Sequence, residues 1–501
     1  MVRSGASPRL PAAVARSLAN AAPTPFWLDQ PDAPEPLPAL AEHVTTELAV
    51  VGGGFTGLWT ALLAKERDPS RDVVLLEARS VGWAASGRNG GFCSASLTHG
   101  IGNGLERFPD EMPLLEKLGE QNLREIGETI AKHDIDCDFE LTGELSVATA
   151  RWQLDGIEEQ AAATRALGHD VDVLDAGAIK QELNSPLFVG GLKVSTGNAM
   201  VEPGRLAWGL RRACLEAGVR IYEQTPVRSI TPGGTGLTLT TPYGSVRAGK
   251  VILGTGVFGR SLLRRIGAYV IPVWDYALMT EPLSAGQLAA LGWNGPRGAS
   301  DMGNQFHYFR MTRDNRMLWG GYDAVYYNGG RIRDEHASSP EVFGKLAEHF
   351  LAAFPQLEGV SFSHAWGGVV DTCSRFCAFF GTAYGGRLGY VAGYTGLGVG
   401  ATRFGAQVLL DKIEDRDSER TRAGSGPLQA AALPAGARPI RGDPADQVVD
   451  RPRGRERGAA RRLAALAGSR WARVRLVARM SRGSAGLGPP RHGHHKISGT
   501  I

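Results

Sequence analysis

Three glycines near the start of the chain follow the spacing G-x-G-x-x-G. Gly52, Gly54 and Gly57 come directly after the apolar run 48–51, and a helical pattern begins at Leu58. The first glycine allows a tight turn, the second lets backbone approach a pyrophosphate, and the third lets a helix pack closely on a strand. Free N–H groups and the positive dipole end at the start of a helix also suit phosphate oxygens. The segment therefore predicts a strand–turn–helix unit that binds a dinucleotide.

A carboxylate stands where such a unit contacts the ribose. Residues 72–76 predict a second apolar strand, and Glu77 follows it directly, twenty residues beyond Gly57. Its carboxylate can accept hydrogen bonds from ribose hydroxyls, which argues against a 2′-phosphate. A glycine-rich turn that binds nothing is the alternative, but strand, helix, second strand and terminal acid all occur in the required order. Dinucleotide binding is therefore the favoured interpretation.

Further glycine-rich segments could contact the same ligand. The sequence Ser-Gly-Arg-Asn-Gly-Gly-Phe at 86–92 offers a cation, an amide and close backbone approach, with a flexible surface loop as the alternative. The sequence Gly-Tyr-Thr-Gly-Leu-Gly-Val-Gly at 393–400 precedes a helical pattern and again places N–H groups at a helix start. Thr255 and Gly256 end another apolar run. Two glycine-rich helix starts far apart in the chain fit one extended cofactor.

The composition is that of an ordinary globular protein. Of 501 residues, 43% are hydrophobic and 21% are charged, and no apolar run reaches the ~18 residues that span a bilayer. The N-terminal residues lack a continuous hydrophobic stretch, so we expect no secretion. Five scattered cysteines favour a reducing cytoplasm over a disulfide framework. Cys373 and Cys377 lack a second ligand pair at suitable spacing, so we expect no metal site.

The basic residues gather at one end of the chain. Residues 422–501 hold 16 of the 55 Lys and Arg but 4 of the 51 Asp and Glu, so residues 1–421 carry 39 basic and 47 acidic side chains. This tail has one aromatic residue, Trp471, and little amphipathic periodicity, so we expect it to be disordered. A tail that binds nucleic acid or anionic membrane is one interpretation. We favour another, a GC-rich gene read out of frame beyond Arg422.

The periodicity of the chain also predicts individual elements. Residues 1–44 contain several prolines and are expected to form an extended arm. Apolar residues at helical spacing predict a helix over 111–133, and a helix that ends before Gly218 is predicted over 205–217. Strand-like residues on both sides of Thr142 and Gly143 predict a β-hairpin.

Taken in order, these motifs resemble the FAD-dependent oxidoreductases of the D-amino-acid oxidase/glycine oxidase superfamily. The Ser-Gly-Arg-Asn-Gly-Gly form and the segment 278–283 look most like the branch that holds γ-glutamylputrescine oxidases and related amine oxidoreductases. The resemblance covers about residues 26–421 and implies a two-domain α/β (α+β) fold, with a Rossmann-like FAD-binding domain and an antiparallel-sheet substrate domain. The implied segments are an arm at 1–44, the FAD-binding domain at 45–95, 200–261 and 362–421, the substrate domain at 96–199 and 262–361, and the tail at 422–501.

The resemblance also implies positions that contact FAD. The glycine motif would hold the pyrophosphate, Glu77 the adenosine ribose, and the backbone of Val227 the adenine. The loop from Ser86 would approach the isoalloxazine ring, and the segment from Thr395 would cover its N1/O2 edge, where helix-start dipoles stabilise the anionic reduced flavin. The full set of expected contacts is Gly52, Gly54, Phe55, Thr56, Gly57, Glu77, Ala78, Arg79, Ser86, Gly87, Arg88, Asn89, Gly90, Val227, Thr255, Gly256, Thr395, Gly396, Leu397 and Gly398.

The implied chemistry is oxidation of the C–N bond of a small amine or amino acid by hydride transfer to flavin N5, followed by hydrolysis of the imine. This reaction needs an unprotonated amine rather than a strong acid–base pair, and no catalytic dyad stands out in the sequence. Arg310 could grip a substrate carboxylate or be a surface charge, and both interpretations stand. His307 should point to the opposite face and be structural. The candidates for the substrate wall are Tyr276, Tyr308, Arg310 and Trp366.

Several points stay open at the level of sequence. A γ-glutamylputrescine-like compound, a D-amino acid and a secondary amine are all candidate substrates, and the electron acceptor is O2 or an electron-transfer partner. Some relatives activate oxygen with a lysine on a strand that aligns with residues 316–321, where this chain has none. Cys373 and Cys377 are expected to be structural rather than flavin-linked. One alternative is an FAD enzyme that acts on a hydroxy acid or modifies a tRNA, although the acidic charge of residues 1–421 disfavours tRNA binding. Another alternative is a C-terminally damaged, non-functional paralogue.

Overall fold

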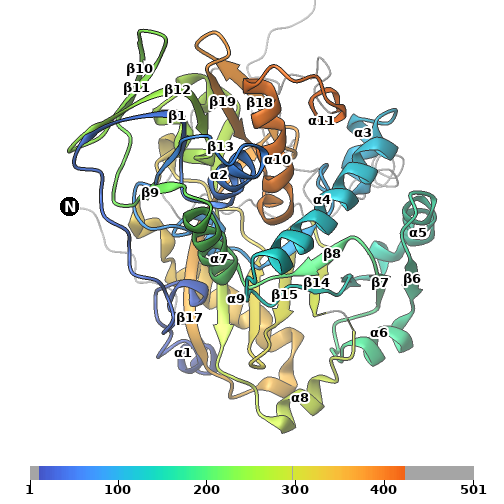
Figure 1. The fold of residues 1–501 in the computed structure, drawn as a ribbon. Helices are drawn as coiled ribbons and strands as arrows, with labels where there is room; N and C mark the ends of the chain where they lie inside the picture. Colours follow the sequence, from blue (N-terminus) through green and yellow to red (C-terminus); the bar gives the residue numbers. More distant parts are fainter. Residues whose placement is uncertain (1–10, 296, 424–501) are drawn as a thin grey trace, which may run out of the picture.

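The computed structural model describes residues 11–295 and 297–423 of the chain. Two eight-stranded sheets and one three-stranded sheet form its framework, and helices pack against them (Figure 1). The mixture of strands and helices agrees with the expected α/β class. The disorder expected for residues 422–501 concerns positions that, beyond Ala423, lie outside the described residues.

Parallel strands form the centre of the first sheet. β1 (His43–Val51) pairs with β2 (Val73–Leu76) on one side and with β12 (Ser245–Leu253) on the other. All four side chains of β2 are buried, as expected for a parallel strand covered on both faces. The two apolar strands predicted around the glycine motif are therefore confirmed. The remaining strands are β9 (Arg220–Tyr222), β10 (Ser229–Gly233), β11 (Gly236–Thr240), β18 (Phe379–Ala383) and β19 (Leu388–Ala392).

Most strands of the second sheet run antiparallel, and one pair, β14 with β5, is parallel. In spatial order they are β17 (Phe362–Cys373), β13 (Val270–Thr280), β16 (Met317–Gly321), β15 (His307–Met311), β14 (Gly298–Asp301), β5 (Glu144–Ala148), β7 (Gly190–Val194) and β6 (Val171–Leu174). β17 pairs with β13 from Val270 to Thr280. The domain boundary proposed at residue 362 therefore falls at the start of a strand of this sheet.

The predicted hairpin around Thr142 and Gly143 is not formed. β4 (Glu140–Leu141) pairs with β8 (Asn198–Met200) in the third sheet, which also contains β3 (Phe92–Ser94), whereas β5 belongs to the second sheet. Gly143 has φ +68°, and an added Cβ would overlap the backbone of Val194. This left-handed residue turns the chain from one sheet into another, and a local strand pattern cannot distinguish that turn from a hairpin.

Three helices pack together beside the first sheet. α2 (Phe55–Arg67) follows the glycine motif and contacts both α7 (Pro203–Glu216) and α10 (Gly398–Ile413). α4 (Met112–Lys132) confirms the helix predicted over 111–133. None of the helices in the described ranges is both long enough and apolar enough to cross a membrane. The other helices are α1 (Ala12–Ser17), α3 (Ile101–Arg107), α5 (Ile157–Ala166), α6 (Ala176–Glu182), α8 (Ala285–Leu291), α9 (Pro340–Ala353) and α11 (Glu419–Arg422).

The N-terminal segment is less extended than its prolines suggest. α1 packs on α9 and ends before Pro23, so the later prolines do not oppose it. Trp27, in the 3-10 turn Phe26–Leu28, is 1% exposed. The segment is thus anchored by a buried aromatic side chain, against the expectation of a purely extended arm.

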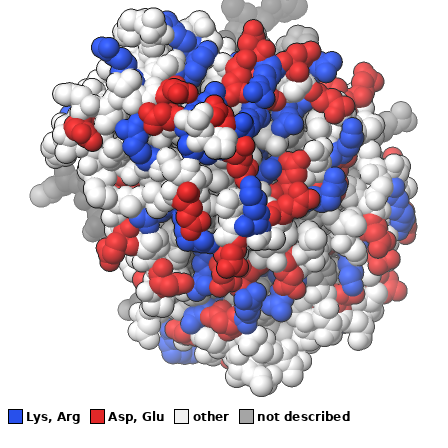
Figure 2. Space-filling view, viewed as in Figure 1, with Lys and Arg blue, Asp and Glu red and all other residues white. Residues whose placement is uncertain are grey.

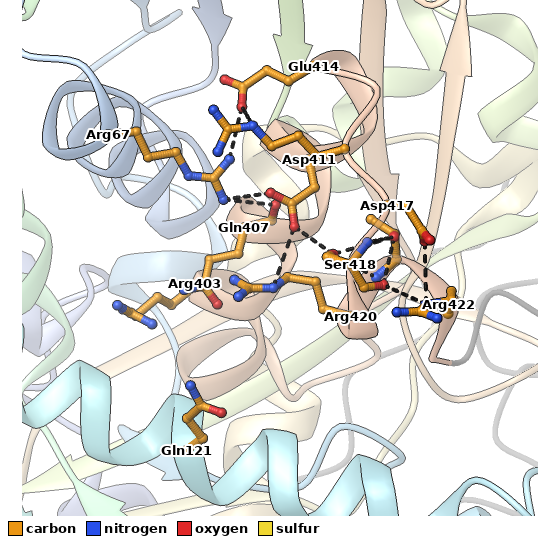
Figure 3. Close-up of polar contacts among 12 residues, drawn as sticks. Arg67, Gln121, Arg403, Gln407, Asp411, Glu414, Asp417, Ser418, Arg420 and Arg422 are labelled. Atoms are coloured by element: carbon orange, nitrogen blue, oxygen red, sulfur yellow. Dashed lines mark hydrogen bonds and ion pairs between the residues drawn. The ribbon is translucent and has the colours of Figure 1, made fainter.

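A cluster of ion pairs ties the last described helices to α2 (Figure 3). Asp411 of α10 lies 2.8 Å from Arg67 Nη2 and 3.5 Å from Arg420 Nε, and it accepts a hydrogen bond from Ser418 Oγ (2.7 Å). The carboxylate is 6% exposed, so its partners replace water that it has lost. This carboxylate therefore joins the C-terminal ends of α2 and α10 to α11.

We expect Asp411→Ala to lower the free energy of unfolding by about 2–3 kcal/mol, because Arg420 loses its carboxylate partner and Arg67 keeps only Glu414. Urea unfolding monitored by circular dichroism measures this change. The matched control is Asp417→Ala, since Asp417 is 77% exposed and its pair with Arg422 is solvated. Equal stabilities of the two variants would contradict a structural role for Asp411.

Candidate active site

One large cavity, with a volume of about 1100 Å³, opens between the two large sheets. It extends from the turn after β1 past residues 83–90 to β13 and β17, and continues to α4, β5 and α5. Small-ligand pockets usually span roughly 300–1,000 Å³. The cavity therefore has room for an extended cofactor together with a small substrate.

The glycine motif forms one end of the cavity. Gly52 has φ +105°, and an added Cβ would lie 2.8 Å from the carbonyl oxygen of Gly254. A Cβ on Gly57 would overlap the carbonyl oxygen of Gly52, so this glycine serves helix–strand packing and does not itself line the cavity. Gly54 is the N-cap of α2 and provides no side-chain cap, which leaves N–H groups of the first turn for a ligand. The geometry is that of an anion cradle.

Seventeen of the expected cofactor contacts line this one cavity, although they come from distant parts of the chain. They are Gly52, Gly54, Phe55, Thr56, Glu77, Ala78, Ser86, Arg88, Asn89, Gly90, Val227, Thr255, Gly256, Thr395, Gly396, Leu397 and Gly398.

Three expected contacts do not line it. Gly57 packs against Gly52, as described above. The guanidinium of Arg79 points outward, where it lies 2.7 Å from Asp334 and 4.2 Å from the centre of the Trp83 ring. Gly87 is buried, and a Cβ there would press against Leu28. These two residues support the loop in the described structure, and their contact with the cofactor stays an untested prediction.

Glu77 is buried at the end of β2. Its Oε2 accepts a hydrogen bond from Gly53 N (2.6 Å), and its Oε1 accepts from Arg79 N and from Trp83 Nε1, both at 2.8 Å. Burial raises the pKa of Glu77 above its ordinary value, and the three donors oppose that rise. The carboxylate thus links the glycine turn to the segment 79–83, and part of it still faces the cavity.

The loop from Ser86 to Gly91 is rigidly held. Ser86 Oγ accepts a hydrogen bond from Phe55 N (2.9 Å), which joins the loop to the start of α2. Arg88 donates through Nε to the Trp83 carbonyl (2.8 Å) and through Nη1 to the Gly367 carbonyl (2.9 Å). Two buried indoles hold the loop from behind, since Trp27 Nε1 donates to the Asn89 carbonyl and Trp366 Nε1 to the Arg88 carbonyl. A flexible surface loop is therefore excluded.

The start of α10 closes another part of the cavity. Thr395 has φ +52° and donates through Oγ1 to the Gly393 carbonyl (3.0 Å), while Gly393 N donates to Asp371 (2.7 Å). α10 begins at Gly398 without a side-chain cap. Thr402 Oγ1 is buried, lines the cavity and has no hydrogen-bond partner among the described residues. Both the helix start and this hydroxyl are available to a ligand.

Two tyrosines expected in the substrate wall, Tyr276 and Tyr308, line the cavity, and Asp275 also lines it. Tyr276 donates to the His336 carbonyl (2.8 Å) and lies 3.0 Å from the hydroxyl of Tyr327. Tyr308 donates to Oδ2 of Asp275 (2.7 Å), which also lines the cavity. Asp275 is not among the residues expected from the sequence, because it follows Trp274 in an apolar strand and belongs to no recognisable motif.

Arg310 and Trp366 do not line the cavity. Arg310 is 3% exposed, donates to the Val201 carbonyl and lies with its guanidinium 5.4 Å from the centre of the Trp27 ring. It shares a strand face with Tyr308 but lies farther along β15, beyond the cavity. Trp366 is 1% exposed and supports Arg88. In the described structure both side chains therefore support neighbouring elements from outside the cavity, and a role for either in substrate binding stays an untested prediction.

His307 lies on the opposite face of β15 from Tyr308. Its Nδ1 is 2.8 Å from Asp301 Oδ2, its Nε2 is 3.0 Å from His349 Nδ1, and its ring stacks on Trp319. The predicted orientation of His307 is confirmed.

We expect Arg310→Leu to lower the free energy of unfolding by about 1–3 kcal/mol, because the buried Val201 carbonyl loses its donor. The KM for any amine should stay unchanged, because the guanidinium does not reach the cavity. Denaturant unfolding and steady-state kinetics measure the two quantities. Arg313→Leu is the control, since that side chain is 72% exposed. A raised KM with unchanged stability would instead support Arg310 as the partner of a substrate carboxylate.

The cavity continues from the tyrosines into a chamber with many carboxylates. Glu144 of β5 accepts hydrogen bonds from Ser300 Oγ (2.7 Å) and Asn198 Nδ2 (3.4 Å). Glu116 lies 3.0 Å from His169, and Asp323 pairs with Lys345 at 2.6 Å. The exposed residues Trp152, Asp155 and Glu159 also line this chamber. Its walls are suited to a cation.

Residues 47–412 match the family model described as FAD dependent oxidoreductase, which covers most of the chain. The chain belongs to this FAD-dependent oxidoreductase family. Its members bind FAD, and the resemblance inferred from the sequence motifs is confirmed. The chain is 33% identical over 399 residues to γ-glutamylputrescine oxidoreductase of Escherichia coli, with 77% of this chain and 87% of that protein covered.

Other relatives agree with this assignment. The probable oxidoreductase OrdL of Haemophilus influenzae is 27% identical over 394 residues, with 77% of this chain and 87% of that protein covered. Among solved structures, glycine oxidase from Geobacillus kaustophilus matches with a TM-score of 0.62 at 21% identity, over 75% of this chain and 96% of that chain. This likeness confirms the fold expected for an FAD-dependent oxidoreductase.

The residues of the cavity fit FAD. The N-cap residues of α2 and α10 provide no side-chain cap, so both helix starts could offer N–H groups, one to a diphosphate and the other to the oxygen-bearing edge of a flavin. A Cβ on Gly54 would lie 2.8 Å from Ser86 Oγ and narrow the cradle, and Thr402 Oγ1 lacks a partner. Cys373 and Cys377 are buried outside the cavity, where Cys373 Sγ donates to the Cys377 carbonyl (3.2 Å). Neither cysteine therefore lies where it could contact a flavin bound in the cavity.

Proposed function

We propose that this FAD-dependent oxidoreductase oxidises the C–N bond of a small cationic amine to an imine, which water then hydrolyses. The observation that carries the proposal is the continuity of the cavity from the glycine cradle to the carboxylate-rich chamber. Bound FAD would supply the two-electron acceptor, and the chain positions the amine beside it. The names of the relatives γ-glutamylputrescine oxidoreductase and glycine oxidase support an amine or amino acid as substrate.

The charge of the lining favours an amine without a carboxylate at the reacting carbon. Within the described ranges the lining includes no lysine and one arginine, Arg88, whose guanidinium is bound to two carbonyl groups. A γ-glutamylputrescine-like compound or a secondary amine fits this lining better than a D-amino acid. The acidic residues of the lining are Glu77, Glu116, Glu144, Asp155, Glu159, Asp275, Asp323 and Asp371.

The surface supports a small molecule rather than a nucleic acid as substrate. On the face in Figure 2, Lys and Arg alternate with Asp and Glu, and the described residues gather into no large basic area there. Phosphate backbones bind where basic side chains cluster. The five cysteines are free, which supports a location in the reducing cytoplasm.

An anaerobic panel of substrates tests the proposed function. We expect purified protein to carry flavin absorption that bleaches with cationic amines, more slowly with D-amino acids, and not with hydroxy acids. Re-oxidation by O2, compared with an artificial electron acceptor, then separates an oxidase from a dehydrogenase. Bleaching by hydroxy acids alone would overturn the amine assignment.

A further inference from the structure

Asp275 and Tyr308 form a hydrogen-bonded pair at the junction of the cradle and the chamber. Tyr308 Oη donates to Asp275 Oδ2 at 2.7 Å, and both side chains line the cavity. The ring of Tyr308 is held between Gly90 and Gly320. A Cβ added to Gly90 would lie 2.8 Å from Cε2 of the ring, and a Cβ added to Gly320 would lie 2.6 Å from Cζ. The pair is thus fixed beside Gly90, in the loop that is expected to approach a bound flavin.

The neighbours of Asp275 leave its charge uncompensated within the wall. Tyr308 faces it from β15 and Tyr276 follows it on β13, whereas β16 and β17 present Gly320 and Gly368 there. Arg88 comes close to Gly368, but its guanidinium is bound to the Trp83 and Gly367 carbonyls. Burial raises the pKa of Asp275 to about 6, while hydrogen bonds from Tyr308 and the backbone of Tyr276 and Gly321 lower it. A cationic ligand would supply the missing counter-charge.

We propose that Asp275 binds the ammonium group of the substrate and accepts its proton, so that the amine is neutral when it is oxidised. This rests on the proposed function. A bound amine displaces water from the carboxylate of Asp275, and a neutral acid–amine pair then becomes favourable relative to two charges. Tyr308 holds the carboxylate in place through its hydroxyl. The pair is the acid–base element that no motif in the sequence marks.

An N–H bond of the ammonium breaks, its electron pair stays on nitrogen, and the proton passes to a carboxylate oxygen of Asp275. Loss of hydride from the carbon next to nitrogen would then oxidise the substrate by two electrons to an iminium ion, and bound FAD would supply the acceptor for those two electrons. Asp275 returns its proton to water when the product leaves.

The pH dependence of flavin reduction tests this assignment. Below about pH 6 Asp275 is protonated in the free enzyme and cannot pair with an ammonium ion, so kcat/KM of the wild type should fall tenfold per unit there. Between about pH 6 and the pKa of the substrate, kcat/KM of the wild type should not change with pH. Asp275→Asn must bind the neutral amine, so its kcat/KM should rise with pH up to the substrate pKa. At about pH 7.5 the loss should be about 10²-fold for an amine of pKa near 10.

Binding of an unreactive amine provides a second readout. tert-Butylammonium has no hydrogen on the carbon next to nitrogen, so calorimetry on the holoenzyme reports its binding without turnover. We expect the wild type to bind it above about pH 6 and Asp275→Asn to bind it at least tenfold more weakly. Asp172→Asn, an exposed aspartate of β6 outside the cavity, is the control and should match the wild type. Equal affinities for Asp275→Asn and the wild type would overturn the proposal.

Tyr308→Phe tests the pair without removing the carboxylate. Loss of its hydrogen bond should move the acid limb of kcat/KM upward by about one pH unit. An acid limb that stays in place in Tyr308→Phe, or that disappears in Asp371→Asn but not in Asp275→Asn, would overturn the role of Asp275. If no amine bleaches the flavin of the wild type, the proposed function itself fails. Bleaching with identical pH profiles in wild type and Asp275→Asn refutes this proposal alone.

Discussion

Gly54→Val should purify without FAD. The added Cβ would lie 2.8 Å from Ser86 Oγ, which accepts the hydrogen bond of Phe55 N, and the two further methyl groups would extend into the cradle. The side chain would therefore both displace the loop at residue 86 and occupy the space through which backbone N–H groups reach the pyrophosphate. The ratio of flavin absorption to protein absorption after gel filtration measures the effect.

Gly286→Val is the matched control for this substitution. Gly286 lies exposed in α8, where an added Cβ would meet its nearest neighbour at 4.0 Å. This variant should retain FAD in the same ratio as the wild type. Circular dichroism of the Gly54→Val apoprotein should show retained secondary structure, because the clash is confined to the cavity. Stoichiometric flavin in Gly54→Val would show that the pyrophosphate binds elsewhere.

Glu77→Ala should weaken FAD binding by about 10²-fold, equivalent to about 2–3 kcal/mol for a charged hydrogen-bond acceptor. The substitution removes the carboxylate that we expect to accept hydrogen bonds from the ribose hydroxyls. It also leaves the N–H groups of Gly53, Arg79 and the Trp83 indole without their partner, so the glycine turn loses its link to the segment 79–83. Titration of apoprotein with FAD, followed by flavin fluorescence, gives the Kd.

Glu47→Ala provides the comparison for this experiment. Glu47 is an exposed residue of β1, the strand next to β2, and does not line the cavity. Its replacement should leave the Kd of FAD unchanged. Should Glu77→Ala bind FAD as tightly as Glu47→Ala, the ribose would have to contact another residue.

Elements with strong local patterns were predicted well. The helix expected at 111–133 is α4, because its apolar residues repeat at helical spacing along one buried face. The strands at 48–51 and 72–76 are continuous apolar runs, which only a doubly covered sheet buries. The hairpin around Gly143 failed because two strands adjacent in sequence joined different sheets. Periodicity identifies a strand and does not choose its partner.

The substrate wall shows the same limit at the level of side chains. Arg310 and Tyr308 are two residues apart and share one face of β15, so the alternation of a strand predicts both equally as residues of the substrate wall. Tyr308 lies opposite Gly320, whose missing side chain leaves room for the ring beside the cavity. Arg310 lies two residues farther on and packs against Trp27, which is 283 positions away in the chain. The cavity reaches Tyr308 on this strand and does not reach Arg310, so only the position of the cavity distinguishes the two residues.

By itself the sequence determined the cofactor cradle, because the glycine turn, the start of α2 and Glu77 lie within one βαβ unit whose geometry follows from residue types at short spacing. The motifs at 86–91 and 393–398 were predictable for the same reason. Only the tertiary structure decided which residues of the expected substrate wall line the cavity. Asp275 meets Tyr308 because β13, β16 and β15 pair side by side, and those pairings depend on strand register across distant segments.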